Sequence, residues 1–259
     1  MKKFLLKLFL LFTGTDALEF CQNVLLKSRY CKENGIKNFP KHQTAIINAF
    51  MDAVFLKEDT AIKTGQGIGK TVLCALLSVY MCITGKAKSV IVLSTLDMER
   101  NNMISLVSNI INTNIFIKHF FKSVEENCIE CVNGSRIYFF YQFDINDKNI
   151  STDNICCIVD EAGGIQSDVC AEYIKNLSYT SGSFMFLTGT PVYNHGLFFD
   201  AFHKYKESFS TYYINSEDID CFEWITKFKK RVIRDFGIDS DYYNVKIKGE
   251  FPREKKYKK

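Results

Sequence analysis

Five short apolar runs constrain the fold of this chain more than any other feature of its sequence. The runs are TAIKT (60–64), SVIVLST (89–95), SRIYFFYQF (135–143), NICCIVDE (154–161) and SFMFLTGT (183–190). They are rich in β-branched and aromatic residues, and helical-looking stretches separate many of them. Near-continuous apolar strands that alternate with helices are typical of a mostly parallel sheet covered by helices on both faces. Because such sheets bind ligands at the carboxyl ends of their strands, we expect an α/β fold with its functional residues just after these runs.

A glycine-rich segment, TGQGIGKT, ends the first run and continues beyond it, at residues 64–71. Its glycines allow backbone N–H groups to converge on phosphate oxygens, while Lys70 offers a charge to the β- and γ-phosphates and Thr71 a hydroxyl to Mg²⁺. The strict P-loop pattern has a glycine at the position of Thr64, which mainly ends the strand, so we treat Thr64 as a tolerated variation. The predicted nucleotide-binding residues are Gly65, Gln66, Gly67, Ile68, Gly69, Lys70 and Thr71. A dinucleotide fingerprint is excluded, because its third glycine would fall at Lys70; a plain glycine-rich turn remains the alternative.

Two adjacent acids, Asp160 and Glu161, end the fourth run. In P-loop enzymes a second strand ends in such acids: Asp160 would hold magnesium through its water shell, and Glu161 would polarise the attacking water as general base. A solvated turn is the alternative, but unpaired neighbouring carboxylates repel one another and gain nothing from packing. The sequence therefore predicts ATP as substrate and Mg²⁺ as cofactor.

Two further groups of residues fit a nucleotide site less specifically. Thr188, Gly189 and Thr190 end the fifth run, where hydroxyl groups can hydrogen-bond the γ-phosphate or the catalytic carboxylate; Thr-Gly-Thr-Pro is also a good turn. In FPKHQ, the amide of Gln43 can pair with the edge of adenine and the ring of Phe39 can stack on it. A lone glutamine on a helix is the alternative for Gln43.

In order and spacing, these motifs resemble the ATPase half of the large terminase subunit of tailed phages, the motor that packs DNA into proheads. The resemblance runs from about residue 17 to residue 252, and its most specific string is YYNVKIKGEFP (242–252). It implies a RecA-like P-loop NTPase of the additional-strand, catalytic-glutamate type. It also implies double-stranded DNA, a portal protein and a small terminase subunit as partners, a ring-forming homo-oligomer, and the host cytoplasm, with no membrane.

Residue by residue, the resemblance implies a role for each motif: Lys70 and Thr71 as phosphate and magnesium ligands, Asp160 as the Walker B acid, Glu161 as catalytic base, Thr188 to Thr190 as the coupling motif, and Gln43 as an adenine contact. One departure concerns charge: many relatives carry an arginine inside the loop, whereas this chain has Gln66. The candidates for the missing charge, acting within the chain or on a neighbouring subunit, are Arg100, Arg136, Arg231 and Arg234. A second departure is that relatives continue into a nuclease, whereas this sequence ends seven residues after Pro252, so we expect no nuclease activity from it.

No linker rich in proline or glycine divides the chain. We divide it into a helical lead-in (1–38), a P-loop ATPase core (39–214), a helical C-terminal subdomain (215–252) and a basic tail (253–259). The tail holds five cations and one acid, which accounts for the whole net charge of +4, so DNA binding does not follow from charge. The opening MKKFLLKLFLLF resembles a secretory signal, but Lys7 interrupts it and no cleavage site follows, so we expect an amphipathic helix. Ten cysteines are scattered, and the single C-x-x-C pair, Cys128 and Cys131, predicts a strand or turn edge with reduced thiols rather than a zinc site.

Two other functions remain open at this point. A helicase-like motor would explain VDEAG and Gln43, but it needs a second similar domain, and roughly seventy residues after Thr190 cannot hold one. A non-catalytic assembly fragment would fold and bind partners without turning over ATP.

Overall fold

The computed structural model of the chain describes residues 16–25, 38–114, 116–124, 127–145, 150–219 and 223–253. Its centre is an eight-stranded sheet with the strand order β3-β4-β5-β2-β6-β7-β1-β8. The strands are β1 (Thr60–Thr64), β2 (Ser89–Ser94), β3 (Phe121–Val124), β4 (Cys128–Cys131), β5 (Arg136–Tyr141), β6 (Ile155–Asp160), β7 (Phe184–Gly189) and β8 (Ser210–Ile214). The six strands from β5 to β8 in this order pair in parallel, whereas β3 and β4 pair antiparallel at one edge. The mostly parallel sheet predicted from the sequence is therefore confirmed.

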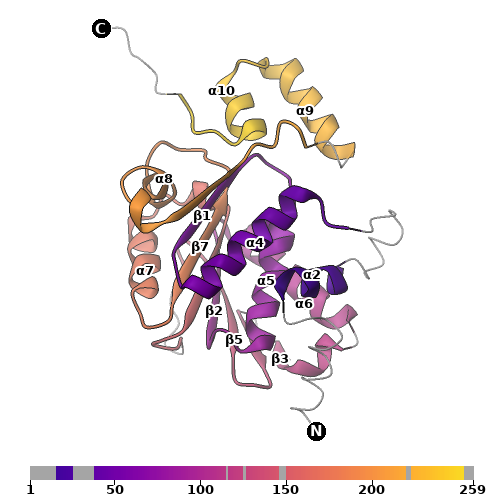
Figure 1. The fold of residues 1–259 in the computed structure, drawn as a ribbon, viewed down its shortest axis with the longest axis vertical. Coiled ribbons are helices and arrows are strands. Elements are labelled where there is room, and N and C mark those ends of the chain that lie inside the picture. The colour runs from indigo at the N-terminus through magenta and orange to yellow at the C-terminus, as the bar shows by residue number, and fades with distance from the viewer. Residues whose placement is uncertain are drawn as a thin grey trace.

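Helices cover both faces of the sheet (Figure 1). The helices are α2 (Ala17–Leu25), α4 (Lys41–Leu56), α5 (Lys70–Thr84), α6 (Asp97–Thr113), α7 (Asp168–Ser178), α8 (Leu197–Phe202), α9 (Glu223–Phe236) and α10 (Asp241–Tyr243), with 3₁₀ turns η1 (Ile117–Phe120), η2 (Ala162–Gly164) and η3 (Lys206–Ser208) and a π-helix, η4 (Asn244–Lys248). One apolar core joins α2, α4, α5 and α6 to one face, and a second joins α7 and α8 to the other. Helix α5 is buried almost all round, as its apolar sequence requires, because it lies between the sheet and neighbouring helices.

Strand β7 shows how one strand serves both cores. Phe184 and Phe186 belong to the core under α4, and Phe50 of α4 meets both rings edge-on, at 6.2 and 5.0 Å between centroids. Met185 and Leu187 point to the opposite face and join the core under α7 and α8. Because successive side chains of a strand alternate between faces, a strand buried on both sides must be apolar at every position.

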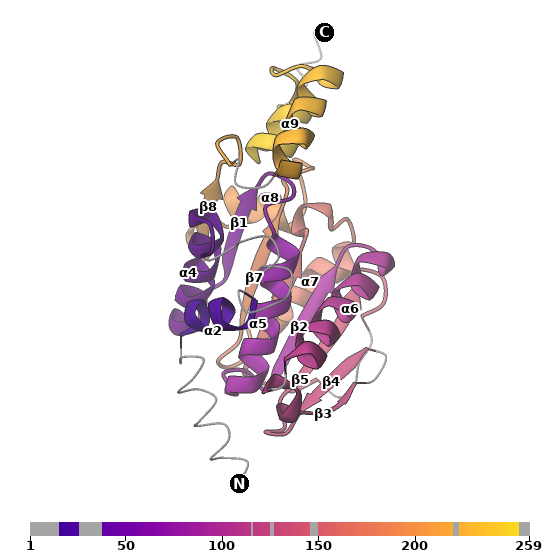
Figure 2. The same cartoon turned by 90° about the vertical axis from the view of Figure 1, so that its right-hand side faces the viewer.

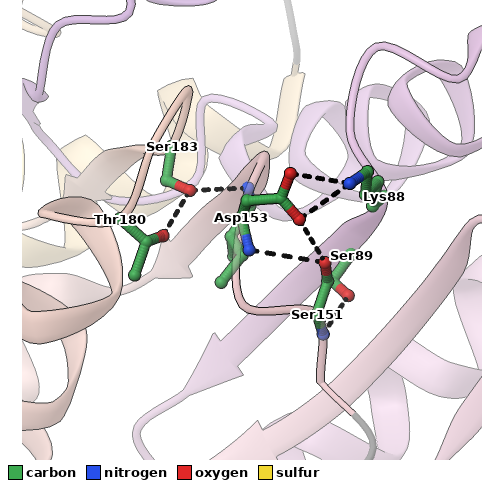
Figure 3. A network of polar contacts seen from close by, with 7 residues as sticks. Lys88, Ser89, Ser151, Asp153, Thr180 and Ser183 are labelled. Carbon is green, nitrogen blue, oxygen red and sulfur yellow. Dashed lines mark hydrogen bonds and ion pairs between the residues drawn. The ribbon is translucent and has the colours of Figure 1, made fainter.

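The amino ends of the central strands are joined by a polar network at the edge of the sheet opposite to the glycine-rich loop (Figure 3). Lys88 Nζ lies 2.8 and 2.6 Å from the two carboxylate oxygens of Asp153, and Ser151 donates its hydroxyl to Asp153 at 3.0 Å. The Ser151 amide donates to Ser89 Oγ at 3.0 Å, and Ser183 Oγ accepts from the first amide of β6 at 2.7 Å. This network holds β2, β6 and β7 in register at one end and leaves their other ends for the functional residues.

The C-terminal residues form a small helical lobe above the carboxyl edge of the sheet, which Figures 1 and 2 show as α9 and α10 beyond the end of β1. After η4 the chain returns to the sheet, where Phe251 packs against the phenylalanine rings of α8. Lys63 of β1 has its ammonium 5.2 Å from the centre of the Phe251 ring and 4.8 Å from that of Tyr213. These contacts dock the G-E-F-P string (249–252) beside the strand that leads into the glycine-rich loop.

All five strands predicted from apolar runs are present, each within two residues of its expected bounds. The strands that no apolar run predicted are β3, β4 and β8, although a strand or turn edge was expected at Cys128 and Cys131. Strand β8 lies at an edge and reads STYYI, so it lacks the apolar run that marks the buried strands. Cys128 and Cys131 bound β4 and are free thiols, as expected. Of the predicted helical lead-in (1–38), the structure describes α2, whereas the amphipathic helix expected in MKKFLLKLFLLF and most of the basic tail lie outside the described residues. Among the residues that the structure describes, no helix is both long and apolar enough to cross a bilayer.

Candidate active site at the carboxyl edge of the sheet

The backbone of the loop between β1 and α5 has a conformation that favours glycine at two positions. Gly67 and Gly69 have φ angles of 85° and 93°, in the region that disfavours residues with a side chain. A Cβ at Gly69 would overlap the amide nitrogen of Gln43, and one at Gly67 would overlap the ring of Trp224. Gly69 also caps α5, so the helix begins directly at Lys70.

The N–H groups of residues 69–72 have no backbone acceptor in the described part of the chain. They lie at the end of the loop and in the first turn of α5, where a helix leaves its first donors unpaired and adds the positive end of its dipole. Successive free N–H groups at a helix start are the standard means of binding a phosphate group. This part of the site therefore fits an anion.

Lys70 is the buried cation of the site. Its side chain is 2% exposed, and Nζ lies 3.0 Å from Gly65 O, 3.3 Å from Glu161 Oε1 and 3.5 Å from Thr190 Oγ1. A buried charge is tolerated when paired and hydrogen-bonded in this way. The ammonium thus joins residues that end three neighbouring strands, β1, β6 and β7.

Glu161 is held in an unusual backbone conformation. Its φ of 52° places it in the left-handed region, which is uncommon for a residue with a side chain. Its carboxylate faces Lys70 and accepts from the Thr190 amide at 3.3 Å. Burial raises the pKa of Glu161, but the Lys70 charge and the Thr190 amide outweigh burial, so the pKa is held below its ordinary value. The residue is thus a carboxylate at neutral pH, as a general base must be.

The pKa of Asp160 is raised, whereas that of its neighbour Glu161 is lowered. Asp160 is 6% exposed, and burial, followed by the charge of Glu161, raises its pKa to about 6. Its Oδ1 has no hydrogen-bond partner in the described part of the chain, and its other interactions include the Thr71 hydroxyl. A buried carboxylate oxygen without a partner, beside a hydroxyl, fits the hard oxygen ligands that Mg²⁺ prefers. No cluster of three or more His, Cys, Asp or Glu suited to a metal occurs among the described residues, so further magnesium ligands would have to be water or substrate oxygens.

The three residues predicted at the end of β7 lie beside these acids. Thr188 pairs with Asp160 in the strand register, is fully buried and has a hydroxyl without a partner in the described part of the chain. A Cβ at Gly189 would lie 2.8 Å from the Ala162 amide nitrogen, so this glycine permits the close approach of the turn after Glu161. Thr190 contacts both Lys70 and Glu161, as described above.

The residues predicted to contact adenine have structural contacts in this protein. Gln43 is 8% exposed, and its Nε2 donates to Ile68 O at 3.0 Å, which ties the glycine-rich loop to α4. Phe39 is also 8% exposed and packs in the core beneath the same helix. Their predicted contacts with adenine stay predictions.

Three contacts come from residues that the motifs did not identify. The amide of Gly65 donates to Ser216 Oγ at 2.9 Å, the amide of Gln66 donates to Lys246 O at 2.8 Å, and the ring of Trp224 lies against Gly67. These partners come about 150 to 180 residues later in the chain, and no local pattern marks them. The string YYNVKIKGEFP, which contains Lys246, was the only signal that could have found one of them.

The four candidate arginines lie in three places. Arg100 of α6 pairs with Asp97 at 2.6 Å and Asp144 at 3.3 Å. Arg136 begins β5, at the edge opposite to the loop, and pairs with Glu130. Arg231 and Arg234 lie exposed on α9 and pair with Asp235 of the same helix. None of their ion pairs within the described residues involves Asp160 or Glu161.

Solved structures with the same arrangement of sheet and helices identify the fold. The large terminase of bacteriophage HK97 superposes with a TM-score of 0.66 at 13% identity, over 82% of this chain and 50% of that one. The ATPase domain of the Thermus phage P74-26 large terminase has a TM-score of 0.60 at 16% identity, over 86% of this chain and 98% of that domain. The chain has the fold of a large terminase ATPase domain.

A third structure, the large terminase of a thermophilic bacteriophage in complex with ADP, shares this terminase ATPase fold with a TM-score of 0.59 at 14% identity, over 82% of this chain and 53% of that one. The chain thus spans about half the length of the HK97 terminase and of this ADP-bound terminase, and it matches nearly all of the P74-26 ATPase domain. No family model and no curated protein sequence matches the chain. The likeness is therefore one of fold, because a shared fold at 13–16% sequence identity does not by itself establish a shared function.

Proposed function

We propose that this chain is the ATP-hydrolysing motor domain of a viral DNA-packaging terminase, which couples ATP hydrolysis to the translocation of double-stranded DNA into a prohead. The observation that carries the proposal is the contact of Lys70 with Glu161 and Thr190, beside the start of α5, where the N–H groups of residues 69–72 have no backbone acceptor among the described residues. The terminase ATPase fold and the ADP bound to the terminase of the thermophilic phage support it.

The residues divide the work of hydrolysis among them. The unpaired N–H groups at the start of α5 bind phosphate oxygens. Lys70 leaves its ion pair with Glu161 and pairs with the incoming phosphates instead. Glu161 then accepts a proton from water as the water oxygen forms a bond to the γ-phosphorus. The bond from phosphorus to the bridging oxygen breaks, and ADP and inorganic phosphate leave. Thr71 and Asp160 would hold Mg²⁺, which would supply positive charge to the phosphate oxygens.

The wider assembly belongs to the same proposal. Double-stranded DNA, a portal protein and a small terminase subunit are the partners, the motor is a homo-oligomeric ring on the portal, and the site of action is the host cytoplasm. Arg231 and Arg234 lie on an exposed face of α9, from which an arginine can reach a neighbouring subunit of a ring. Residues 39–214 form the ATPase core, and residues 215–252 form its C-terminal subdomain.

The test is steady-state phosphate release with Mg²⁺ and ATP, with and without linear double-stranded DNA. We expect turnover by the wild type, loss of nucleotide binding or turnover in Lys70→Ala, and ATP binding without hydrolysis in Glu161→Gln. Lys118→Ala and Glu172→Gln change the same charges at exposed positions of the described surface and should keep full turnover. Unchanged turnover in Glu161→Gln would remove the general base from the proposal, and a wild type that binds but never hydrolyses ATP would favour an assembly fragment.

A further inference from the structure

The C-terminal lobe reaches the glycine-rich loop through the π-helix η4. The Gln66 amide donates to Lys246 O at 2.8 Å, and a Cβ at Gly65 would overlap the carbonyl oxygen of Ile247. A Cβ at Gly249 would likewise overlap the backbone of Thr64. These are contacts of backbone on backbone, so the position of Lys246 relative to the loop is set without the help of its side chain.

The Lys246 side chain has no ion-pair partner within the described residues. The next lysine along, Lys248, lies 4.0 Å from Glu217 and over the ring of Tyr243. Lys246 is half-buried, and its charge acts on Glu161, where it adds to the effect of Lys70 in holding the pKa of that carboxyl low. A half-buried ammonium beside a loop that can bind phosphate, without an ion-pair partner among the described residues, favours an anion as its partner.

Glutamine stands at position 66 of the loop, and the four candidate arginines pair with acids elsewhere, Arg136 at the opposite edge of the sheet. Lys70 approaches the site from the start of α5, whereas Lys246 approaches it from the C-terminal lobe. Both residues border the glycine-rich loop, Lys70 directly after it and Lys246 through the hydrogen bond from the Gln66 amide to its carbonyl oxygen, so a phosphate bound by the loop would lie between the two elements that carry these cations.

We propose that Lys246 binds the γ-phosphate of ATP within the same chain and supplies the second positive charge of the site. This assignment rests on the proposed ATPase function and deepens it. Because ADP lacks the γ-phosphate, Lys246 contributes to the binding of ATP and not to that of ADP. Positive charge directed at the phosphoryl group during transfer also stabilises the transition state, so Lys246 raises the rate of hydrolysis as well.

The test measures binding separately from turnover. Isothermal titration calorimetry with Mg²⁺ present would give dissociation constants for ATP-γ-S and for ADP in the wild type, Lys246→Ala, Lys246→Gln and Lys246→Arg. Lys248→Ala is the matched control, because it removes the same charge from the same π-helix. Thermal unfolding of each variant would establish that it is folded; Lys246→Gln keeps most of the length of the side chain in case the alanine variant is unstable.

We expect the alanine and glutamine variants to bind ATP-γ-S at least tenfold more weakly and ADP within twofold of the wild type. Lys246→Arg should retain ATP-γ-S binding within about threefold, and Lys248→Ala should match the wild type for both nucleotides. Equal weakening for ADP and ATP-γ-S would show a structural role for Lys246 and overturn the assignment, as would unchanged ATP-γ-S binding. If the wild type bound neither nucleotide, the proposed function itself would fail, and that result differs from both of the others.

Discussion

Asp160 should destabilise the nucleotide-free protein, and its replacement by asparagine should therefore stabilise the fold. Burial raises the pKa of this carboxyl from 3.8 to about 6, and Oδ1 has no partner in the described part of the chain. Each pH unit between the folded and unfolded pKa values is worth about 1.4 kcal/mol, so ionisation of Asp160 costs the folded state about 2–3 kcal/mol at pH 8. Asp160→Asn keeps the shape of the side chain and removes this cost.

The sign and the pH window follow from the same values. Well below pH 3.8 the carboxyl is protonated in both the folded and the unfolded state, so it does not change the free energy of unfolding. As the pH rises from 3.8 through the folded pKa of about 6, the wild type loses free energy of unfolding, and above pH 6 nearly the full loss is present. Asp160→Asn should therefore exceed the wild type in free energy of unfolding by about 2–3 kcal/mol at pH 8 and by only about 0.5 kcal/mol at pH 4.

The assay is urea denaturation at both pH values with EDTA and without nucleotide, followed by far-ultraviolet circular dichroism. Asp239→Asn removes a carboxylate at an exposed position and should leave the stability unchanged within about 0.5 kcal/mol. If Asp160→Asn were no more stable than the wild type at pH 8, the buried carboxylate would not carry the desolvation cost on which this reasoning depends. Mg²⁺ should stabilise the wild type and not Asp160→Asn, because the ligand is gone.

Two further predictions concern the loop. Gly69→Ala introduces a methyl group against Gln43 at a φ of 93°. We expect it to destabilise the fold by about 1–3 kcal/mol and to weaken ATP binding at least tenfold. Gly134→Ala has the same φ with open space around it, so this control separates the effect of backbone strain from that of the clash. Trp224 is the single tryptophan of the chain and lies against Gly67. Its fluorescence emission should therefore change on titration with ATP-γ-S, with a midpoint equal to the calorimetric dissociation constant. An unchanged spectrum at saturating nucleotide would mean that nucleotide binding does not alter the surroundings of this ring.

The central strands of the sheet were predictable because their signals are local. A strand buried on both faces must be apolar throughout, and β1, β2, β5, β6 and β7 each carry that signature over a few residues. The edge strand β8 escaped prediction for the same reason: half of its surface is not covered, so STYYI needs no apolar run. The glycines of the loop and the paired acids were visible because turn geometry and charge constrain residue type at adjacent positions.

The roles of Gln43 and Lys246 could not be predicted in this way. Gln43 was predicted to contact adenine, but in this structure its amide ties α4 to the loop through Ile68 O, a contact that only the packing of α4 brings about. Lys246 stands in a string with two lysines, and nothing in N-V-K-I-K distinguishes the one whose carbonyl binds the Gln66 amide from the one that lies near Glu217.

By itself, the sequence determined the sheet, the glycine-rich loop and the identity of its acids, since periodicity, turn chemistry and charge act between neighbours in the chain. Only the tertiary structure decided that the C-terminal lobe lies on the loop, with Ser216 and Lys246 bound to its amides and Trp224 against Gly67. Contacts across more than 150 residues depend on how whole elements pack, and packing rewards shape and hydrogen-bond complementarity that no short pattern records.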